Sequence, residues 1–313
     1  METIRACSIW RALEVVGDVP VLLIMERAFL GCHRFEEFVA QTHLARSVVN
    51  SRLARLVEVG LFEKAPAGSG RRLAYRLTDK GRDLFPTALM ILRWQHRWEP
   101  ARRGYQVRLS HRTCGQAMEP VAACAACEGE INPREVTWCP GPGLSQVVPD
   151  YSRRRKPTAA AVARRDGLAM VDSAIELFGD RWATLVVRAC FTGIHRFDDI
   201  QRDTLMATNV LADRLDRLLG QGIVKPIQYS AHRERFEYHL TEKGRDLYPV
   251  LLALLKWGDA WFADEKGPPL LLTHQPCGQR LDLTARCSAC GGVLDLGNVA
   301  FAMGGERGRD DPA

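Results

Sequence analysis

The sequence predicts a mainly α-helical protein with small β-hairpins, made of two copies of one unit in tandem. Three observations support this fold class. The second half of the chain repeats the first, each half changes from helical to alternating apolar spacing, and each half ends in the same histidine and cysteine spacing. The length of 313 residues is enough for about two domains.

The repeat is the strongest of these signals. Identical segments recur at a constant spacing, which shifts by one residue between residues 65 and 75. The recurring segments are Gly17-Asp18 with Gly179-Asp180, His33-Arg34-Phe35 with His195-Arg196-Phe197, Arg52-Leu53 with Arg214-Leu215, and Lys80-Gly81-Arg82 with Lys243-Gly244-Arg245. Two long copies indicate a domain duplication rather than a solenoid.

Each copy is expected to begin with helices. Segments 8–16, 20–30 and the stretch from Phe35 have helical apolar spacing, and segment 45–60 places Val49, Leu53 and Leu56 on one stripe. Leu211, Leu215 and Leu218 form the same stripe in the second copy. Gly60 and Gly222 suit the left-handed residue that ends a helix.

After that glycine the period changes to two. LFEKA and RLAYRLT, then IVKPIQY and FEYHLT, alternate apolar and polar residues around turn formers, as paired strands do. Thr78 and Thr241 are expected to cap a last helix that ends with Trp94 and Trp98, or Trp257 and Trp261. A hairpin after a helix-turn-helix is a wing, so the sequence predicts two winged helix-turn-helix domains in tandem.

The order of these segments resembles the HxlR family of bacterial transcriptional regulators, which is related to the MarR winged helices. The stretches CSIWRALEVVGD, RLARLVEVGLFEK and YRLTDKGRDLFP carry the resemblance in the first copy, and HRFDDIQ, LADRLDRLLGQGIV and YHLTEKGRDLYPVL carry it in the second. They span roughly residues 7–99 and 169–262. The chain departs from the family where Ala45-Arg46 and Ala207-Thr208 replace Ser-Pro, and where Pro20 replaces a tryptophan kept as Trp182.

The resemblance implies a DNA-binding regulator of transcription whose partner is double-stranded DNA. Family members are usually single-domain dimers, so two units in one chain imply an intramolecular pseudo-dimer and leave a homodimer of two chains open. Cys7 matches a family position that can sense oxidants, and Ala169 stands there in the second copy. The predicted domains are 7–100 and 168–263 for the winged helices, 105–138 and 270–300 for zinc-ribbon-like extensions, 139–167 for a basic linker, and 301–313 for a disordered tail.

A winged helix places its second helix-turn-helix helix in the major groove and its wing along a backbone or minor groove. The candidate DNA-binding residues are Arg46, Ser47, Asn50, Ser51, Arg55, Arg71 and Arg72 in the first copy, and Thr208, Asn209, Asp213, Arg214, Arg217, Arg233 and Arg235 in the second. Arginine and asparagine are the types that make bidentate contacts to guanine and adenine.

The two recognition helices differ in charge. The first carries three arginines, Arg46, Arg52 and Arg55, and a single acidic residue, Glu58. In the second, two arginines balance two aspartates. Because phosphate neutralisation supplies most non-specific affinity, we expect the first copy to bind DNA more strongly. The alternative is that these charges, and the linker run 153–156, are solvated surface only.

Each copy ends in the spacing H-x2-C-x9-C-x2-C. The candidate ligands are His111, Cys114, Cys124 and Cys127, and then His274, Cys277, Cys287 and Cys290. Two close pairs of ligands on neighbouring turns can close a tetrahedral site, so the sequence predicts two structural zinc ions, one in each extension. The alternative is a strand pair that holds buried or free thiols. Cys7, Cys32 and Cys190 lie outside these motifs and are expected to be small packed residues.

Other classes of function are disfavoured. No GxGxxG, P-loop, HExxH or GxSxG context is present, so no enzyme is expected. No apolar run reaches the roughly 20 residues of a membrane helix and no secretory signal is visible, which predicts a cytoplasmic protein. The net charge of +6 fits an anionic partner. The alternative function is a redox- or zinc-responsive switch in which one winged helix binds a protein rather than DNA.

Overall fold

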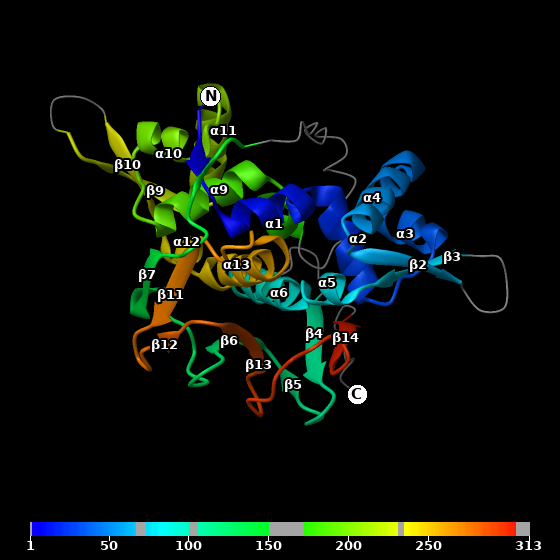
Figure 1. Ribbon diagram of the computed structural model, residues 1–313. Helices are drawn as coiled ribbons and strands as arrows, with labels where there is room; N and C mark the ends of the chain where they lie inside the picture. The colour runs from blue at the N-terminus through cyan, green and yellow to red at the C-terminus, as the bar shows by residue number, and fades with distance from the viewer. Residues whose placement is uncertain (1, 67–72, 100–105, 150–171, 231–234, 305–313) are drawn as a thin grey trace, which may run out of the picture. The chain divides into compact units, whose positions relative to one another are not determined.

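The computed structural model describes residues 2–66, 73–99, 106–149, 172–230 and 235–304, which form two compact units (Figure 1). Unit 1 comprises Met1–Val19, Ala123–Arg154 and Glu176–Leu283. Unit 2 comprises Pro20–Ala122, Arg155–Ile175 and Thr284–Ala313. Within these described ranges, every helix is too short or too polar to cross a membrane.

Unit 2 contains the winged helix of the first repeat. Its elements are α2 (Val19–Phe29), α3 (Phe35–Thr42), α4 (Arg46–Glu58), β2 (Phe62–Pro66), β3 (Leu73–Leu77), α5 (Asp79–Arg82) and α6 (Phe85–Trp98). Strands β2 and β3 pair antiparallel with Phe62 opposite Leu77, which confirms the predicted wing. The rings of Phe38, Phe62 and Tyr75 meet edge to face below it and fix the hairpin against α3.

Unit 1 contains the winged helix of the second repeat. Its elements are α9 (Arg181–Phe191), α10 (Phe197–Thr204), α11 (Thr208–Gly220), β9 (Val224–Gln228), β10 (Phe236–Leu240), α12 (Glu242–Arg245) and α13 (Tyr248–Phe262). Strands β9 and β10 pair antiparallel with Val224 opposite Leu240. The predicted apolar stripes are confirmed, because Leu53, Leu56, Leu211 and Leu218 all have 0% exposure.

A threonine and two glycines connect the end of α4 to α5, and the end of α11 to α12 in the second repeat. Gly60 has φ +77° and follows α4, so that its N–H bonds Val57 O at 3.0 Å. Thr78 donates to Gly60 O at 2.6 Å and accepts from the N–H of Gly81 at 3.2 Å, so it is a cap as predicted, but of the short helix α5, whereas the helix that ends at Trp98 begins separately at Phe85. A Cβ on Gly81 would lie 2.3 Å from Leu61 O. Thr241 makes the same bonds in the second repeat, which gives the recurring Thr-x-x-Gly its reason.

The first helix of the first repeat belongs to unit 1. Helix α1 (Ser8–Val16) buries its apolar face against α13 of the second repeat, where Ser8 Oγ donates to Asp259 Oδ1 at 2.5 Å. Arg11 donates to Phe262 O at 2.8 Å. A Cβ on Gly258 would lie 2.3 Å from Ser8 O, so this glycine permits the close approach.

The boundary between the units falls inside helix α8 (Asp172–Phe178), which opens the second repeat. Its first residues, up to Ile175, belong to unit 2, where the N–H of Ala174 donates to Gln95 Oε1 of α6 at 3.0 Å. The predicted boundaries 7–100 and 168–263 therefore differ from the two compact units, since unit 1 takes α1 from the first repeat and unit 2 takes the start of α8 from the second. An amphipathic helix can bury its stripe against either copy of a duplicated partner, so the sequence pattern cannot decide this.

Most of the remaining strands belong to the two cysteine-containing segments. They are β4 (Gln106–His111), β5 (Ala117–Met118), β6 (Pro120–Cys124), β7 (Val136–Pro140), β11 (Leu270–His274), β12 (Gln279–Arg280), β13 (Leu283–Cys287) and β14 (Val299–Gly304). A short 3-10 helix, Pro133–Glu135, precedes β7.

Two predicted limits need correction here. Residues 301–304 belong to β14, which pairs with β4 along its length, so the predicted tail 301–313 begins too early. The predicted linker 139–167 also begins with ordered strand: β7 extends to Pro140, and β8 (Gln146–Val147) pairs with β1 (Ile4–Arg5). Backbone hydrogen bonds to distant strands order these segments, and local composition does not reveal such partners. The basic run 153–156 lies outside the described residues.

Candidate nucleic-acid interface and metal centres

Helix α4 presents the predicted polar residues on one outward face. Arg46, Ser47, Asn50, Ser51 and Arg55 are all exposed. The opposite stripe of α4 is fully buried, with Val49, Leu53 and Leu56 at 0% exposure. The helix begins at Arg46, so its first two turns carry the residue types that can read base edges.

Arg46 is held by a glutamate from the neighbouring helix α3. Its two terminal nitrogens donate to the two carboxylate oxygens of Glu36, each at 2.6 Å, and its guanidinium lies 5.1 Å from the centre of the Phe35 ring. The hydrogen bond from Arg46 lowers the pKa of Glu36. Glu36 thus orients Arg46 at the helix start and competes with any anion that Arg46 would bind.

Helix α11 presents a different outward face. Thr208, Asn209, Asp213 and Arg217 are exposed, as predicted for surface residues, and so is Asp216. The exposed charges of α11 are therefore two aspartates and one arginine, whereas those of α4 are Arg46, Arg55 and Glu58. The exposed face of α11 is therefore net acidic and that of α4 net basic, because Arg214 is not part of the exposed face of α11.

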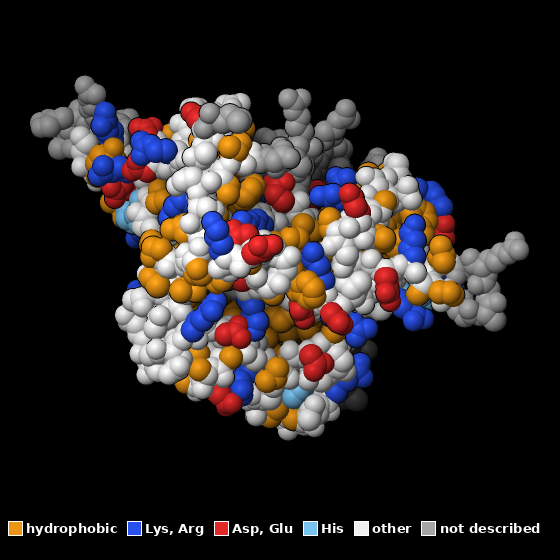
Figure 2. All heavy atoms as spheres, viewed as in Figure 1, with side chains coloured by type: hydrophobic (Ala, Val, Ile, Leu, Met, Phe, Trp, Pro, Cys, Tyr) orange, Lys and Arg blue, Asp and Glu red, His pale blue; other side chains and the backbone are white. Residues whose placement is uncertain are grey.

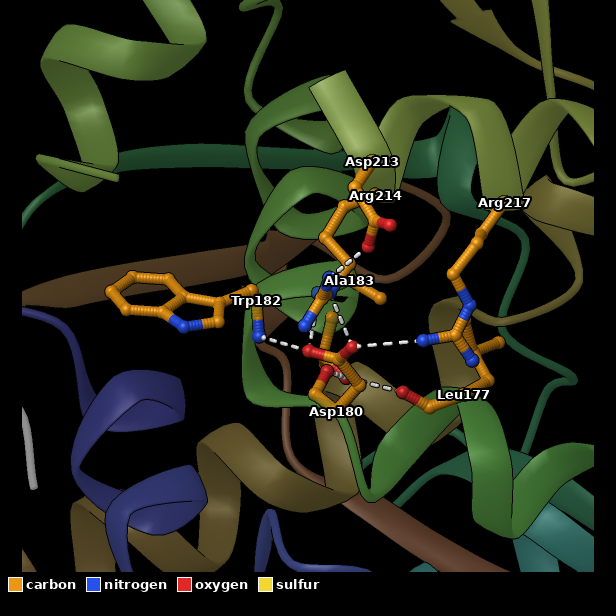
Figure 3. Close-up of polar contacts among 8 residues, drawn as sticks. Leu177, Asp180, Trp182, Ala183, Asp213, Arg214 and Arg217 are labelled. Atoms are coloured by element: carbon orange, nitrogen blue, oxygen red, sulfur yellow. Dashed lines mark hydrogen bonds and ion pairs between the residues drawn. The ribbon is translucent and has the colours of Figure 1, made fainter. Parts of the chain in front are cut away.

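Arg214 is buried, with 5% exposure, and its guanidinium pairs with Asp180 and Asp213. Figure 3 shows the Asp180 carboxylate between the start of α9 and the two arginines of α11. It accepts from the N–H groups of Trp182 at 3.1 Å and Ala183 at 3.4 Å, and Arg217 lies 3.3 Å from its second oxygen. The expected placement of Arg214 on the DNA-facing surface is corrected, because its charge is committed to a buried ion pair that fixes α11 on α9.

The described parts of the wings also carry basic side chains. The predicted residue Arg235 is exposed beside β10. Three further basic residues, which the sequence analysis did not predict, are exposed on the wing strands: Lys64, Arg76 and Lys225. The predicted wing residues Arg71, Arg72 and Arg233 lie outside the described residues. On the face drawn in Figure 2, basic side chains lie among acidic ones over the β9–β10 hairpin, and the same mixture covers α3 with β2 and β3.

Unit 2 holds one cluster of potential metal ligands. His111, Cys114, Cys287 and Cys290 bring one nitrogen and three sulfur atoms within 4.8 Å of one another. His111 Nδ1 lies 3.2 Å from Cys290 Sγ, and Cys114 Sγ lies 4.0 Å from Cys287 Sγ. His111 is only 2% exposed, so its ring is fixed by the surrounding protein.

Unit 1 holds the second cluster. Cys124, Cys127, His274 and Cys277 also lie within 4.8 Å of one another. His274 Nδ1 is 3.4 Å from both Cys127 Sγ and Cys277 Sγ, and Cys124 Sγ is 4.0 Å from Cys277 Sγ. His274 is 1% exposed. The same eight residues were predicted as ligands, but the predicted grouping by repeat is corrected. Each cluster takes its His-x2-Cys pair from one repeat and its Cys-x2-Cys pair from the other.

The four ligand pairs share one turn geometry. In each pair the residue after the second ligand has φ between +65° and +69° and donates its N–H to the first ligand's carbonyl at 2.8 or 2.9 Å. Those residues are Gly115, Glu128, Gly278 and Gly291. The N–H groups of Ala289 and Gly292 also point at Cys287 and Cys290 Sγ, at 3.4 Å. Turns of this kind present both ligand atoms of a pair to one point.

The comparison with known families decides the class of protein. The family model described as HxlR-like helix-turn-helix matches residues 15–103 and 177–266, which is more than half of the chain. The chain belongs to the HxlR-like helix-turn-helix family. The expected family and the tandem duplication are thereby confirmed.

Relatives of this HxlR-like protein are regulators of transcription. It is 42% identical over 138 residues to an uncharacterized HTH-type transcriptional regulator of Mycobacterium tuberculosis, covering 44% of this chain and 87% of the relative. It is 34% identical over 107 residues to another from Synechocystis sp., covering 34% of this chain and 78% of that one. A solved structure of a candidate transcription factor from Pseudomonas aeruginosa is 30% identical, covers 40% of this chain and 85% of its own, and has a TM-score of 0.31.

The other cysteines of this HxlR-like protein differ in burial. Burial raises the pKa of the Cys190 thiol to about 12, and the thiol donates to Tyr238 O at 3.4 Å. Burial also raises the pKa of Cys32. Both are buried thiols whose raised pKa disfavours the thiolate, in agreement with the interpretation as small packed residues. Cys7 is half-buried at the start of α1, where its carbonyl accepts from the N–H of Arg11.

Sequence reasoning missed the Asp180 carboxylate as a positioning group of the recognition helix. The signal was available, because Gly-Asp and Arg-Leu recur together in both repeats. A recurring acidic residue and a recurring basic residue in one helical domain are candidates for an ion pair. The pattern alone leaves open whether such an arginine faces solvent or the protein.

Proposed function

We propose that this HxlR-like protein is a sequence-specific regulator of transcription that binds double-stranded DNA with its two winged helices as an intramolecular pseudo-dimer. The observation that carries the proposal is the outward face of α4, where Arg46, Ser47, Asn50, Ser51 and Arg55 lie exposed on a helix whose other side is fully buried. A rigid helix with such a face fits the major groove.

The chemistry of each side chain suggests its role. Arg46 and Asn50 would contact base edges from the first two turns of α4, and Arg55, further along, would contact a phosphate. On α11, Thr208 and Arg217 would take the positions of Arg46 and Arg55, and Asn209 that of Ser47. The basic residues of the described wing strands, Lys64 and Arg76, would add phosphate contacts.

The proposed binding is asymmetric. The exposed face of α11 carries Asp213 and Asp216, which repel phosphate, and Arg214 is committed to Asp180. The face of α4 carries a single exposed aspartate or glutamate, Glu58, which is paired with Arg55 at 3.1 Å. The first repeat would therefore dominate affinity, and the DNA site would be an imperfect palindrome with one strong half-site.

Two structural zinc ions fit the ligand clusters. A tetrahedral ion with Zn–S bonds of about 2.3 Å holds its sulfurs about 3.8 Å apart, which is close to the 4.0 Å between Cys114 and Cys287 Sγ. Each histidine is at least nine-tenths buried, and its Nδ1 lies 3.2 or 3.4 Å from a cysteine Sγ, so that one ion could be held by the nitrogen and the sulfurs together. Three cysteines and one histidine saturate zinc, which suits a structural role.

Binding-site selection on random duplexes tests the proposed function. The full chain is expected to enrich one sequence and to bind it with an affinity that falls steeply with salt, because phosphate contacts release counterions. Failure to enrich any sequence, together with binding that does not depend on salt, would overturn the proposal.

A second candidate is favoured by the acidic face of α11. In that case only the first repeat reads DNA, and the second winged helix binds a protein. The selection experiment separates the two, because a single half-site would be enriched in place of two half-sites at a fixed spacing.

Oxidation at Cys7 would be a switch in either case, and thiol counting before and after mild peroxide treatment tests it.

Replacing Glu36 with glutamine is expected to tighten DNA binding by about two- to fivefold at low salt, because Arg46 loses its exposed ion-pair partner and becomes available to DNA. Titration of the selected duplex by fluorescence anisotropy measures the change. Glu265→Gln is the control, since it removes the same charge from an exposed position. Equal gains in both variants would show that net charge, and not Arg46, is responsible.

A further inference from the structure

The strands that flank the metal ligands pair between repeats. Strand β4, which ends at His111, pairs along its length with β14 near the end of the second repeat, with His111 opposite Val299. Strand β11, which ends at His274, pairs with β7 of the first repeat, with His274 opposite Val136. Both ladders consist of backbone hydrogen bonds between strands of different repeats.

The ladders deliver the ligand pairs of different repeats to the same place. In unit 2 the His111–Cys114 turn meets the Cys287–Cys290 turn, and in unit 1 the Cys124–Cys127 turn meets the His274–Cys277 turn. The two pairs of one sequence motif thus belong to different compact units. A single extension folded on itself would keep all four residues of its motif in one unit.

A glycine of the second repeat makes room for the histidine of the first. A Cβ on Gly292, two residues after Cys290, would lie 2.9 Å from His111 Cε1. Gly129 stands at the same place after Cys127, where a Cβ would make an ordinary contact with His274 Cε1 at 3.9 Å. Each Cys-x2-Cys turn thus packs against the histidine from the other repeat, most closely in unit 2.

We propose that each zinc ion joins the two repeats, so that the two ions fasten the exchanged arrangement at His111, Cys114, Cys287 and Cys290 and at Cys124, Cys127, His274 and Cys277. This proposal rests on the zinc ions of the proposed function but not on DNA binding. Each ion ties together residues that are 147 to 179 positions apart in the chain. Clips that close such long loops restrict the unfolded chain most.

Zinc counting in paired variants tests the grouping. The full chain is expected to hold two zinc ions, measured by native mass spectrometry and by a colorimetric zinc assay after denaturation. Cys114→Ser with Cys287→Ser removes two ligands of one cluster and is expected to leave one ion. Cys114→Ser with Cys124→Ser, the matched control with two ligands of one sequence motif, damages both clusters and is expected to leave none.

The opposite pattern, with no ion left after Cys114→Ser and Cys287→Ser and one ion left after Cys114→Ser and Cys124→Ser, would overturn the proposal. A full chain without zinc would overturn it as well. Neither result touches DNA binding, which the selection experiment measures separately.

If both double variants lose all zinc through misfolding, disulfide formation in the metal-free full chain shows which thiols lie close together. Diamide takes up two hydrogen atoms from a thiol pair as a disulfide forms. In Cys127→Ser with Cys290→Ser, peptide mass mapping is expected to find Cys114 joined to Cys287 and Cys124 joined to Cys277, whose sulfurs lie 4.0 Å apart. Disulfides between Cys114 and Cys124 would contradict the exchanged arrangement.

Discussion

Replacing Asp180 with alanine is expected to lower the free energy of unfolding by about 3–5 kcal/mol. The substitution leaves the Arg214 guanidinium, whose side chain is 6% exposed, with only the half-exposed Asp213 as a partner. It also removes the carboxylate that caps α9 at the N–H groups of Trp182 and Ala183. Chemical denaturation of the full chain, followed by circular dichroism, measures the change.

Arg217→Ala is the matched control for this effect. Arg217 binds the same carboxylate, but its side chain is 43% exposed, so its loss is expected to cost less than about 1 kcal/mol. Asp180→Asn keeps an oxygen for the cap and should fall between the two. If Asp180→Ala changed stability no more than Arg217→Ala does, the buried pair would not fix α11 on α9.

Replacing Arg46 and Asn50 together with alanine is expected to weaken binding to the selected duplex by at least about thirtyfold. Both side chains are exposed in the first two turns of α4, and each can make a bidentate contact to a base. Binding to a scrambled duplex should fall much less, because non-specific affinity depends on the remaining phosphate contacts. Anisotropy titrations on both duplexes give the ratio.

Thr208→Ala with Asn209→Ala, at the first two residues of α11, forms the control and is expected to weaken binding by less than about fivefold. The reason is the acidic face of α11, which limits its contribution. Arg55→Ala should reduce the salt slope by about one without changing the sequence preference. Equal losses at α4 and α11 would contradict the asymmetry and favour two equivalent half-sites.

The elements were predictable because local patterns encode them. The apolar stripe of α4, the alternating strands of the wings and the caps at Thr78 and Thr241 all depend on residues within a few positions of one another. The outward face of α4 followed from the same stripe, since the residues opposite a buried face must meet solvent. Arg214 is the exception to this rule. It lies next to the buried Leu215, and it pairs with Asp180, the N-cap residue of α9, which lies outside its own helix.

The sequence by itself determined that the chain is a duplicated winged helix-turn-helix protein and that eight residues are potential metal ligands. Only the tertiary structure decided which ligands share a cluster and that α1 of the first repeat packs in the unit of the second. The physical reason is the duplication. Two nearly equivalent copies offer each strand, helix and ligand pair two chemically similar partners, and the choice between them depends on contacts such as that of Ser8 with Gly258 and the pairing of β4 with β14.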